Sequence, residues 1–294
     1  KLFAEVARQG MPAVAMTDHG NMFGAYEFFQ ISKKYDGDQN PLIKPIIGIE
    51  AYVAPSTRKS RVQEFWGTSR DAGDPDAEGG KDVSGGGRYT HMTMWAKDSE
   101  GLHNLFRLSS LASYEGYYMK PRMDRELMGQ YSGGIIASTG CPSGEVQTRL
   151  RLGQFEEACQ AASDYRDIFG RENYFCELMD HGVPIEKQVR SDLLKLAKKL
   201  DIPLLVTNDS HYVTEDQADA HDSLLCVGVG RNKDDPNRFR FNGSGYYIKS
   251  SEQMRALFPD HPEACDNTLL LTEMIGSYDE VFKYVDRMPQ FDVP

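Results

Sequence analysis

Short apolar runs that each end in a polar residue recur along this chain. The first run, residues 13–16, is followed by Thr17-Asp18-His19-Gly20 and then by a helical pattern of apolar positions over residues 23–32. These two patterns predict a buried strand followed by a helix, which is half of a βα unit. In βα barrels the carboxyl ends of the strands carry the functional residues. The tetrad that contains His19 is therefore the first candidate site.

Further apolar runs of strand length follow, and most contain or precede a residue that can bind a metal ion. Two of these runs, residues 44–53 and 89–96, contain Glu50 and His91 respectively. The other three, residues 134–138, 174–179 and 202–206, precede Cys141, His181, and the pair Asp209 and His211, in that order. Helical patterns lie between and after them, over residues 2–8, 154–168, 189–200, 252–258 and 265–275. Strands that alternate with helices predict an α/β fold, here of the TIM-like barrel type.

Two segments have signals outside this alternation. Residues 56–88 are rich in Gly, Asp, Ser and charge, which predicts a long mobile surface loop, more often a tolerated insertion than a lid. Residues 238–241 and 246–249 flank the pair Asn242-Gly243, and this arrangement predicts a β-hairpin.

The two ends of the chain predict where the domain begins and ends. A helical pattern is already present at residue 2, and Lys1 is not a methionine, so we expect a fragment that lacks the first strand of the barrel. Residues 286–294 lack a pattern of packed apolar positions and predict a linker. We therefore expect one domain over residues 1–285.

Composition narrows the class of protein. A chain of 294 residues with 40% hydrophobic and 26% charged residues can bury the core of one large α/β domain. No apolar run approaches the ~20 residues of a membrane span, so we expect no membrane partner and a cytoplasmic location. The five cysteines form no C-x-x-C pair, which favours a reducing compartment. The net charge of -11 is typical of an acidic surface, yet it does not exclude a nuclease, because carboxylates also build metal sites.

The residues at the strand ends share one kind of chemistry. Neutral imidazole, carboxylate and thiolate are the usual protein ligands of metal ions, and strands of a barrel converge at one mouth. Metal ions in such a site can lower the pKa of a water molecule and neutralise a phosphodiester, whereas a Gly-x-Ser-x-Gly elbow and a P-loop are both absent from the sequence. The pattern therefore predicts a hydrolytic metal centre. Its candidate ligands are His19, Glu50, His91, Cys141, Asp209 and His211.

Five motifs together resemble the PHP (polymerase and histidinol phosphatase) domain, and within it the PHP domains of bacterial DNA polymerase III alpha subunits of actinobacterial type. They are Thr17-Asp18-His19-Gly20, Gly48-Ile49-Glu50-Ala51-Tyr52, Tyr89-Thr90-His91, Thr139-Gly140-Cys141-Pro142-Ser143-Gly144 and Thr207-Asn208-Asp209-Ser210-His211-Tyr212. The likeness runs nearly from end to end, and its motifs are specific in combination and in order. Residues 286–291 resemble the junction to a polymerase palm.

The resemblance implies a distorted (βα)7 barrel with up to three divalent metal ions, for which zinc, manganese, iron and magnesium are all candidates. By this resemblance Glu50 bridges two ions, and Asp209 joins it at the first. Glu50, His91 and Cys141 hold the second ion, and His19 and His211 hold the third. The same six ligands form the catalytic centre. Asp18 is implied to orient or polarise His19 from behind.

The activity that the resemblance implies is 3′-5′ exonuclease proofreading, in which the terminal phosphodiester of a primer strand is hydrolysed during DNA replication. The implied partners are the primer 3′ end, the polymerase palm and thumb of the same polypeptide, and replisome subunits such as the sliding clamp, in the nucleoid region of the cytoplasm. The family's opening His-x-His motif would lie before Lys1. We therefore expect the chain as given to retain one well-made ion site, formed by Glu50, His91 and Cys141.

Weaker signals concern residues around this set. His181 follows a strand but falls outside the ligand pattern, so we expect it on the rim or behind the ligands. Aromatic and basic residues in two places are able to stack on and follow a single strand of DNA. The first group is Tyr117, Tyr118, Lys120 and Arg122, and the second is Arg149 and Arg151. For the first group a purely structural role is an equal alternative.

Two rival functions stay open at this point. One is a non-catalytic module, stabilised by metal, that supports a polymerase or docks a partner. The other is a phosphatase for a small phosphate ester, which the insertion at residues 56–88 and the polymerase-like closing segment make the weaker rival.

Overall fold

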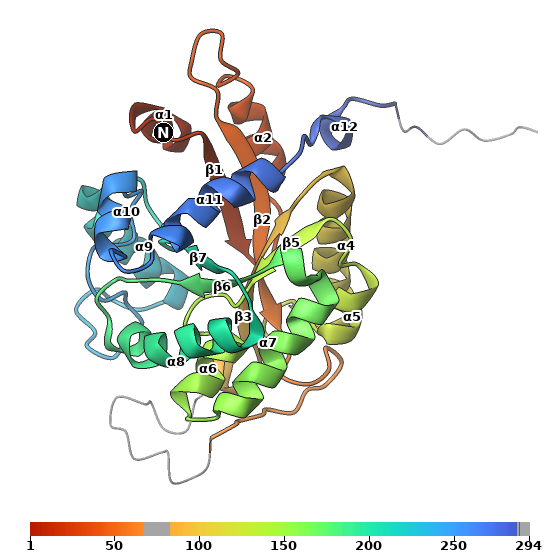
Figure 1. The fold of residues 1–294 in the computed structure, drawn as a ribbon, viewed down its shortest axis with the longest axis vertical. Helices are drawn as coiled ribbons and strands as arrows, with labels where there is room; N and C mark the ends of the chain where they lie inside the picture. The colour runs from red at the N-terminus through yellow and green to blue at the C-terminus, as the bar shows by residue number, and fades with distance from the viewer. Residues whose placement is uncertain (68–82, 287, 289–294) are drawn as a thin grey trace, which may run out of the picture.

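The computed structural model describes residues 1–67, 83–286 and 288 (Figure 1). The strands are β1 (Ala13–His19), β2 (Lys44–Val53), β3 (Thr90–Ala96), β4 (Arg122–Met123), β5 (Ile135–Ser138), β6 (Tyr174–Leu178) and β7 (Leu204–Val206). The helices are α1 (Leu2–Arg8), α2 (Ala25–Ser32), α3 (Ser84–Gly87), α4 (Ser99–Glu115), α5 (Arg125–Gln130), α6 (Glu145–Arg151), α7 (Phe155–Phe169), α8 (Pro184–Leu200), α9 (Ala218–Val229), α10 (Ser251–Leu257), α11 (Pro262–Met274) and α12 (Asp279–Phe282), with short 3-10 turns η2 (Arg171–Asn173) and η3 (Glu215–Gln217).

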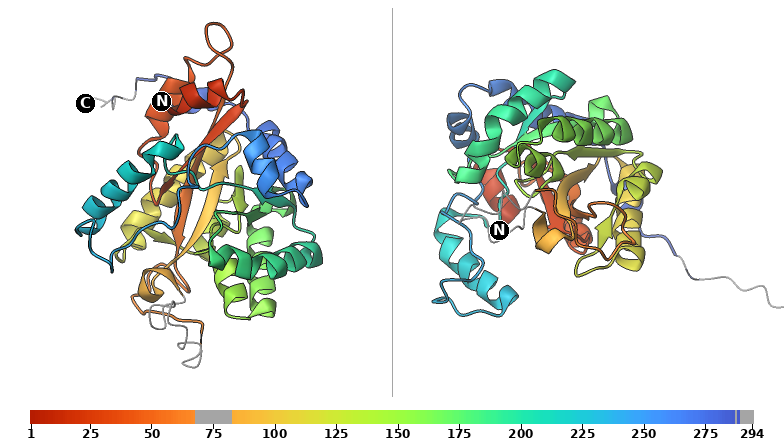
Figure 2. Two further views of the ribbon diagram at one scale, coloured as in Figure 1. Left: turned by 90° about the vertical axis from the view of Figure 1, so that its left-hand side faces the viewer. Right: turned by 90° about the horizontal axis from the view of Figure 1, so that it is seen from below.

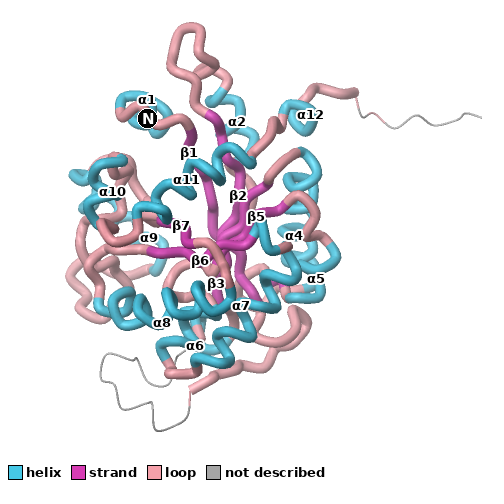
Figure 3. Tube along the Cα trace, viewed as in Figure 1, coloured by secondary structure: helices cyan, strands magenta, loops and turns pink. Residues whose placement is uncertain are grey.

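The strands form one curled sheet in the order β1-β2-β3-β5-β6-β7, and the short strand β4 pairs with β2. The pairs β1·β2, β5·β6 and β6·β7 are parallel, whereas β3 is antiparallel to both β2 and β5. The strands lie at the centre of the molecule and the helices surround them (Figure 3). These features confirm the predicted α/β fold of the distorted barrel type. Because β3 runs in the opposite direction, its amino end lies at the same edge as the carboxyl ends of its neighbours.

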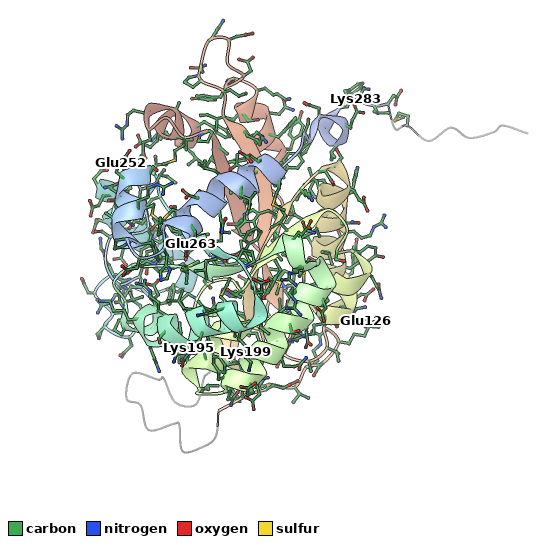
Figure 4. All side chains as sticks on the ribbon, viewed as in Figure 1. Glu126, Lys195, Lys199, Glu252, Glu263 and Lys283 are labelled. Atoms are coloured by element: carbon green, nitrogen blue, oxygen red, sulfur yellow. The ribbon has the colours of Figure 1, made fainter. Side chains whose placement is uncertain are left out.

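Burial explains why these segments pack as they do. In β2 every residue from 46 to 53 is buried, since helices cover the outer face of the sheet and the barrel interior covers the other. On the outer face, Leu102, Leu105 and Leu108 of α4 are fully buried at a helical spacing. Seen from below, helices lie around the sheet on several sides (Figure 2, right). Charged side chains such as Lys195 and Glu126 project outward from this helical layer (Figure 4).

The barrel is open between its first and last strands. The sheet path ends at β1 and β7, which do not pair with each other in the described part of the chain. A cleft of about 920 Å³ lies there, and its lining includes Val14 and Met16 of β1, Met179 after β6, and Asp209 after β7. The cleft therefore leads from the solvent to the carboxyl ends of the strands.

Arg122 is a buried structural residue, which corrects its prediction as a DNA contact. It is 1% exposed, and its guanidinium donates hydrogen bonds to the carbonyl oxygens of Arg58 (3.0 Å), Ser60 (2.6 Å), Arg88 (3.1 Å) and Gly116 (3.0 Å). These acceptors belong to both flanks of the predicted insertion and to the end of α4. Four of the five N–H donors of this buried guanidinium are bonded to backbone carbonyls, so the side chain is not presented to a phosphate in solution.

The prediction of a β-hairpin around Asn242-Gly243 is wrong. Neither residues 238–241 nor residues 246–249 form a strand, and only Tyr247 makes an isolated bridge, to Tyr212. The backbone carbonyls of Gly245 and Tyr247 instead accept hydrogen bonds from the Asn208 side chain, at 3.0 and 2.7 Å. A contact with a distant loop thus replaces the local pairing that the turn signal predicted.

Some predicted segments lie outside the described residues. These are residues 68–82 of the predicted insertion and residues 287 and 289–294 of the predicted linker. The mobility of the insertion and the domain boundary at residue 285 stay predictions. Among the described helices, none has both the length and the apolar character needed to cross a membrane.

Candidate metal centre

Glu50 lies at the centre of the candidate site and uses its two carboxylate oxygens differently. It is 8% exposed. Its Oε2 lies 2.7 Å from His19 Nδ1, whereas its Oε1 lies 2.9 Å from His91 Nδ1 and accepts a hydrogen bond from Cys141 Sγ at 3.3 Å. Each oxygen of the carboxylate therefore faces a different group of side chains, and the bridging role of Glu50 stays a prediction.

The sheet register explains how distant parts of the sequence meet at Glu50. In the parallel pair β1·β2, His19 is the partner of Glu50, so both side chains point to the same face. In the antiparallel pair β2·β3, His91 is the partner of Tyr52, two residues beyond Glu50 on the same face. His91 therefore reaches the site from the beginning of its strand, whereas Glu50 lies inside β2 and the remaining candidate ligands lie at or just after the carboxyl ends of their strands.

The loop after β5 presents Cys141. The backbone N–H of Gly144 donates to the Cys141 carbonyl at 2.7 Å, and the His91 N–H donates to the carbonyl of Ser143 at 3.1 Å. The buried side chain of Gln147 donates to the Gly140 carbonyl at 2.6 Å. These bonds hold the thiol 3.4 Å from His91 Nδ1.

Glu50, His91 and Cys141 form the one group of three potential ligands that the described residues bring within 4.8 Å of one another. The set offers one oxygen, one nitrogen and one sulfur atom, which suits zinc and other borderline divalent ions. The residues present therefore fit a resident metal ion. This is the set that sequence reasoning expected to survive in the chain as given.

His19, Asp209 and His211 lie around this group without completing a second cluster. The rings of His19 and His211 are 6.1 Å apart between centroids. His211 Nδ1 donates to the Asp209 carbonyl oxygen at 2.7 Å, which leaves Nε2 as the nitrogen available to an ion. All three residues line the open cleft together with Glu50 and Cys141. The assignment of all six ligands stays a prediction.

The protonation states in the site are strongly coupled to one another. Burial alone would raise the pKa of Glu50, but hydrogen bonds from His19 and His91 hold this pKa well below its usual range. The hydrogen bond to Glu50 raises the pKa of His19. Burial raises the pKa of the Cys141 thiol well above its usual value, and the negative charges of Glu50 and Asp209 add to that shift. An ion at this site must therefore displace the proton of the Cys141 thiol.

Asp18 lines the open cleft beside the candidate ligands, whereas the His181 side chain is buried. Asp18 lies against Gly24 together with Met16, on the face of β1 opposite His19, and burial raises the pKa of Asp18. His181 has a buried side chain that contacts Glu186 and the loop after β7.

Two features escaped sequence reasoning. Glu177 of β6 is 3% exposed inside the barrel, where burial raises its pKa and its carboxylate accepts hydrogen bonds from Ser138 and Thr207. The sequence signal that could have identified Glu177 is a carboxylate within an apolar run. His221 of α9 lies beside His211 at 5.3 Å between ring centroids, and no local pattern in the sequence indicates that contact.

The candidate DNA contacts differ in their availability. Tyr117 is 58% exposed, and Lys120 is exposed with its Nζ 5.3 Å from the ring of Tyr52 at the edge of the site. The ring of Tyr118 is flanked by arginine side chains, including Arg61 and Arg88.

The second group, Arg149 and Arg151, lies in the last turn of α6. The Arg149 guanidinium stacks on Trp66 at 3.8 Å and donates to Gln154, and Arg151 is partly buried. Lys120 is thus the candidate cation that the structure places beside the metal-ligating residues.

Comparison with known proteins agrees with this geometry. The family model described as "PHP domain" matches residues 1–181. The chain is 59% identical to DNA polymerase III subunit alpha of Saccharopolyspora erythraea over 290 residues, which cover 98% of this chain and 24% of that protein. It is 54% identical over 295 residues to the proteins of the same name from Mycobacterium leprae and Mycobacterium tuberculosis. These matches cover 100% of this chain and 24% of each relative. The chain therefore spans about a quarter of the length of the curated relatives it matches.

We expect Cys141→Ser to remove the sulfur ligand of the bound ion. Titration with Co²⁺ should give a thiolate-to-cobalt charge-transfer band in the native protein, and this band should be lost in the variant. Cys159→Ser is the matched control, because Cys159 is a buried cysteine of α7 away from the site. A band that persists in Cys141→Ser would place the ion elsewhere.

We expect metal affinity to fall as the pH is lowered from about 8 to about 6. An ion held by Glu50, His91 and Cys141 must displace the proton of Cys141, whose pKa is raised well above its usual value, so this proton costs about tenfold in affinity per pH unit. Zn²⁺ titrations at several pH values measure this slope. The slope should be shallower by about one proton in Cys141→Ser, and an affinity independent of pH would contradict the assignment.

Proposed function

The chain belongs to the PHP domain family, as its motifs predicted, and we propose that it is the metal-dependent 3′-5′ exonuclease domain of a replicative bacterial DNA polymerase III alpha subunit. The observation that supports this most is the Glu50 carboxylate, whose two oxygens face separate groups of ligands at 2.7 and 2.9 Å. A bridging carboxylate is typical of sites that hold two ions close together, and such sites hydrolyse phosphodiesters.

The residues of the chain would divide the work as follows. Glu50, His91 and Cys141 would hold one ion, Glu50 and Asp209 would hold a second, and His19 and His211 would hold a third. Ions at these donors would lower the pKa of a water molecule and neutralise the charge on the phosphodiester.

The reaction proposed is hydrolysis of the last phosphodiester of a primer strand. The oxygen of water bonds to phosphorus, the bond from phosphorus to the 3′ oxygen of the preceding nucleotide breaks, and that oxygen takes up a proton. The products are a nucleoside 5′-monophosphate and a strand one nucleotide shorter. The open cleft of about 920 Å³ is large enough to admit a nucleotide to the ligands.

The local charge at the site supports a nucleic-acid substrate despite the net charge of -11. Lys120 lies beside Tyr52 at the edge of the site, and Arg61 and Arg88 both lie against the ring of Tyr118. Exposed Tyr117 adds an aromatic surface next to these cations. Cations and aromatic side chains together follow the backbone and stack on the bases of a single strand.

The exonuclease proposal predicts that Glu50→Gln and His91→Ala, made in the complete protein, abolish excision of a mismatched primer terminus. The rate should fall at least about 100-fold, equivalent to roughly 3 kcal/mol of barrier. Cys159→Ser serves as the matched control. The measurement is the rate at which the terminal nucleotide is excised from a labelled primer in the presence of Mg²⁺ or Mn²⁺.

The same variants separate the rivals. Excision that is unchanged while the free energy of unfolding drops would favour the non-catalytic module. Hydrolysis of a free phosphomonoester without excision of the primer would favour the small-molecule phosphatase.

A matched pair of substitutions tests the proposed strand path. Lys120→Met should weaken binding of a single-stranded oligonucleotide several-fold and reduce the salt dependence by about one counterion, with the free energy of unfolding nearly unchanged. Arg122→Met should lower the free energy of unfolding by about 3 kcal/mol or more, since it leaves buried carbonyls unpaired. Lys195→Met, at an exposed position on α8, controls for loss of charge. Oligonucleotide affinity that is equal in Lys120→Met and in this control would remove Lys120 from the path.

A further inference from the structure

His181 joins three parts of the chain, namely β6, α8 and the loop after β7. It follows β6, and its side chain is 1% exposed. Its Nδ1 lies 2.6 Å from Glu186 Oε1 in the first turn of α8, and its Nε2 lies 2.9 Å from the carbonyl oxygen of Asn208, just after β7. The other oxygen of Glu186 accepts the backbone N–H of His181 at 2.6 Å.

The partners of the ring determine where its protons lie. A carbonyl oxygen can only accept, so Nε2 carries a proton and donates it to Asn208. Nδ1 bonds to a carboxylate oxygen of Glu186, so protein atoms engage both ring nitrogens. Burial lowers the pKa of His181, but the bonds to Glu186 and Asn208 outweigh burial and raise it. With both nitrogens bonded to protein atoms, the ring has no free lone pair for an ion.

The carbonyl that His181 holds begins an unusual turn. Asp209 has a φ of 43°, in the left-handed region that a residue with a side chain adopts only when its surroundings impose it. The next bond of this turn joins His211 Nδ1 to the Asp209 carbonyl at 2.7 Å. The conformation at Asp209 therefore fixes the directions of both the Asp209 carboxylate and the His211 ring.

Residues 245–249 hold the same turn from the other side. The Asn208 side chain donates to Gly245 and Tyr247 and accepts from Lys249 Nζ at 2.9 Å. The His211 N–H donates to the Tyr246 carbonyl at 2.8 Å, and the ring of Tyr246 stacks on His181 at 4.1 Å between centroids. Asn208 is thus bonded through both its side chain and its carbonyl.

We propose that His181 is a positioning residue that sets the Asn208–Asp209 turn, so that Asp209 and His211 face the metal centre while Glu50, His91 and Cys141 are held independently of it. This proposal rests on the metal centre of the proposed function. In this proposal the Glu186–His181 pair positions Asp209 and His211 and does not position the other three ligands. The Cys141 loop has its own support in Gln147 and in the bridge between His91 and Gly144.

A merely structural role predicts a different response to substitution. A buried ring that serves only to fill space is replaceable by an apolar ring of similar size. His181→Phe keeps the stacking surface for Tyr246 and removes both ring nitrogens. It therefore isolates the hydrogen bond to Asn208 from the packing of the ring. Tyr165→Phe is the matched control, because it removes a buried hydrogen bond of 2.7 Å to Glu145 elsewhere in the barrel.

Amide hydrogen exchange of the complete protein without metal provides the first test. We expect the amides of His211 and Tyr212 to exchange at least about tenfold faster in His181→Phe, whereas the amides of β5 and β6 keep their native rates. Tyr165→Phe should leave His211 and Tyr212 unchanged. Native exchange at these two amides in His181→Phe would overturn the proposal, and so would acceleration spread evenly over the whole sheet.

Cobalt binding provides the second test and separates this proposal from the proposed function. His181→Phe should keep the thiolate-to-cobalt band of the Cys141 ion, while the affinity of further ions falls about 10- to 100-fold, the usual effect of losing a group that orients a ligand. Equal weakening of the Cys141 ion would overturn the independent positioning. If the native protein gives no thiolate band, the metal centre itself fails, and the exchange experiment alone decides the role of His181.

Discussion

The fold places a carboxylate where an isolated charge is costly, and the surrounding strands satisfy that charge. Glu50 lies in the middle of a strand whose neighbours on both sides are buried. Leaving a buried carboxylate unpaired costs several kcal/mol, so the chain must supply positive charge or hydrogen-bond donors on both oxygens. It does so with His19 and Cys141 from parallel strands and with His91 from an antiparallel one. The same donors are the ligands that a divalent ion requires. Satisfying the charge and building the metal centre are therefore one structural requirement.

The reversal of β3 follows from the same requirement. If β3 ran parallel to β2, a histidine near its beginning would lie at the bottom of the barrel, far from the mouth. The antiparallel register pairs His91 with Tyr52 instead, beside Glu50. The sequence showed a histidine at the start of a strand but carried no local signal of strand direction, because alternation of apolar and polar positions is the same in both directions. Strand direction is a tertiary property, and only the pairing partners reveal it.

Features with local causes were predictable, and features with distant partners were not. The strands and helices around His19, Cys141 and Asp209 followed from runs of apolar residues that the structure retains. The hairpin around Asn242-Gly243 failed because Asn208, more than thirty residues earlier, takes the carbonyls of Gly245 and Tyr247. Arg122 looked like a surface cation, since nothing nearby in the sequence indicates that distant carbonyls would surround it. Side-chain chemistry was thus readable from the sequence, whereas the identity of each partner was not.

The two halves of the site have separate supports, and this has a consequence for how the site tolerates change. The half formed by Glu50, His91 and Cys141 is held by sheet pairing and by Gln147, and it requires little from the loop after β7. The half formed by Asp209 and His211 depends on a left-handed turn that begins at Asn208, whose carbonyl is bonded to the His181 ring and whose side chain is bonded to residues 245–249. Sheet pairing holds its residues through many hydrogen bonds, whereas a turn of this kind stores backbone strain at one residue. The second half is therefore the part of the site whose geometry responds most to a single substitution, although the strands that carry both halves belong to one sheet.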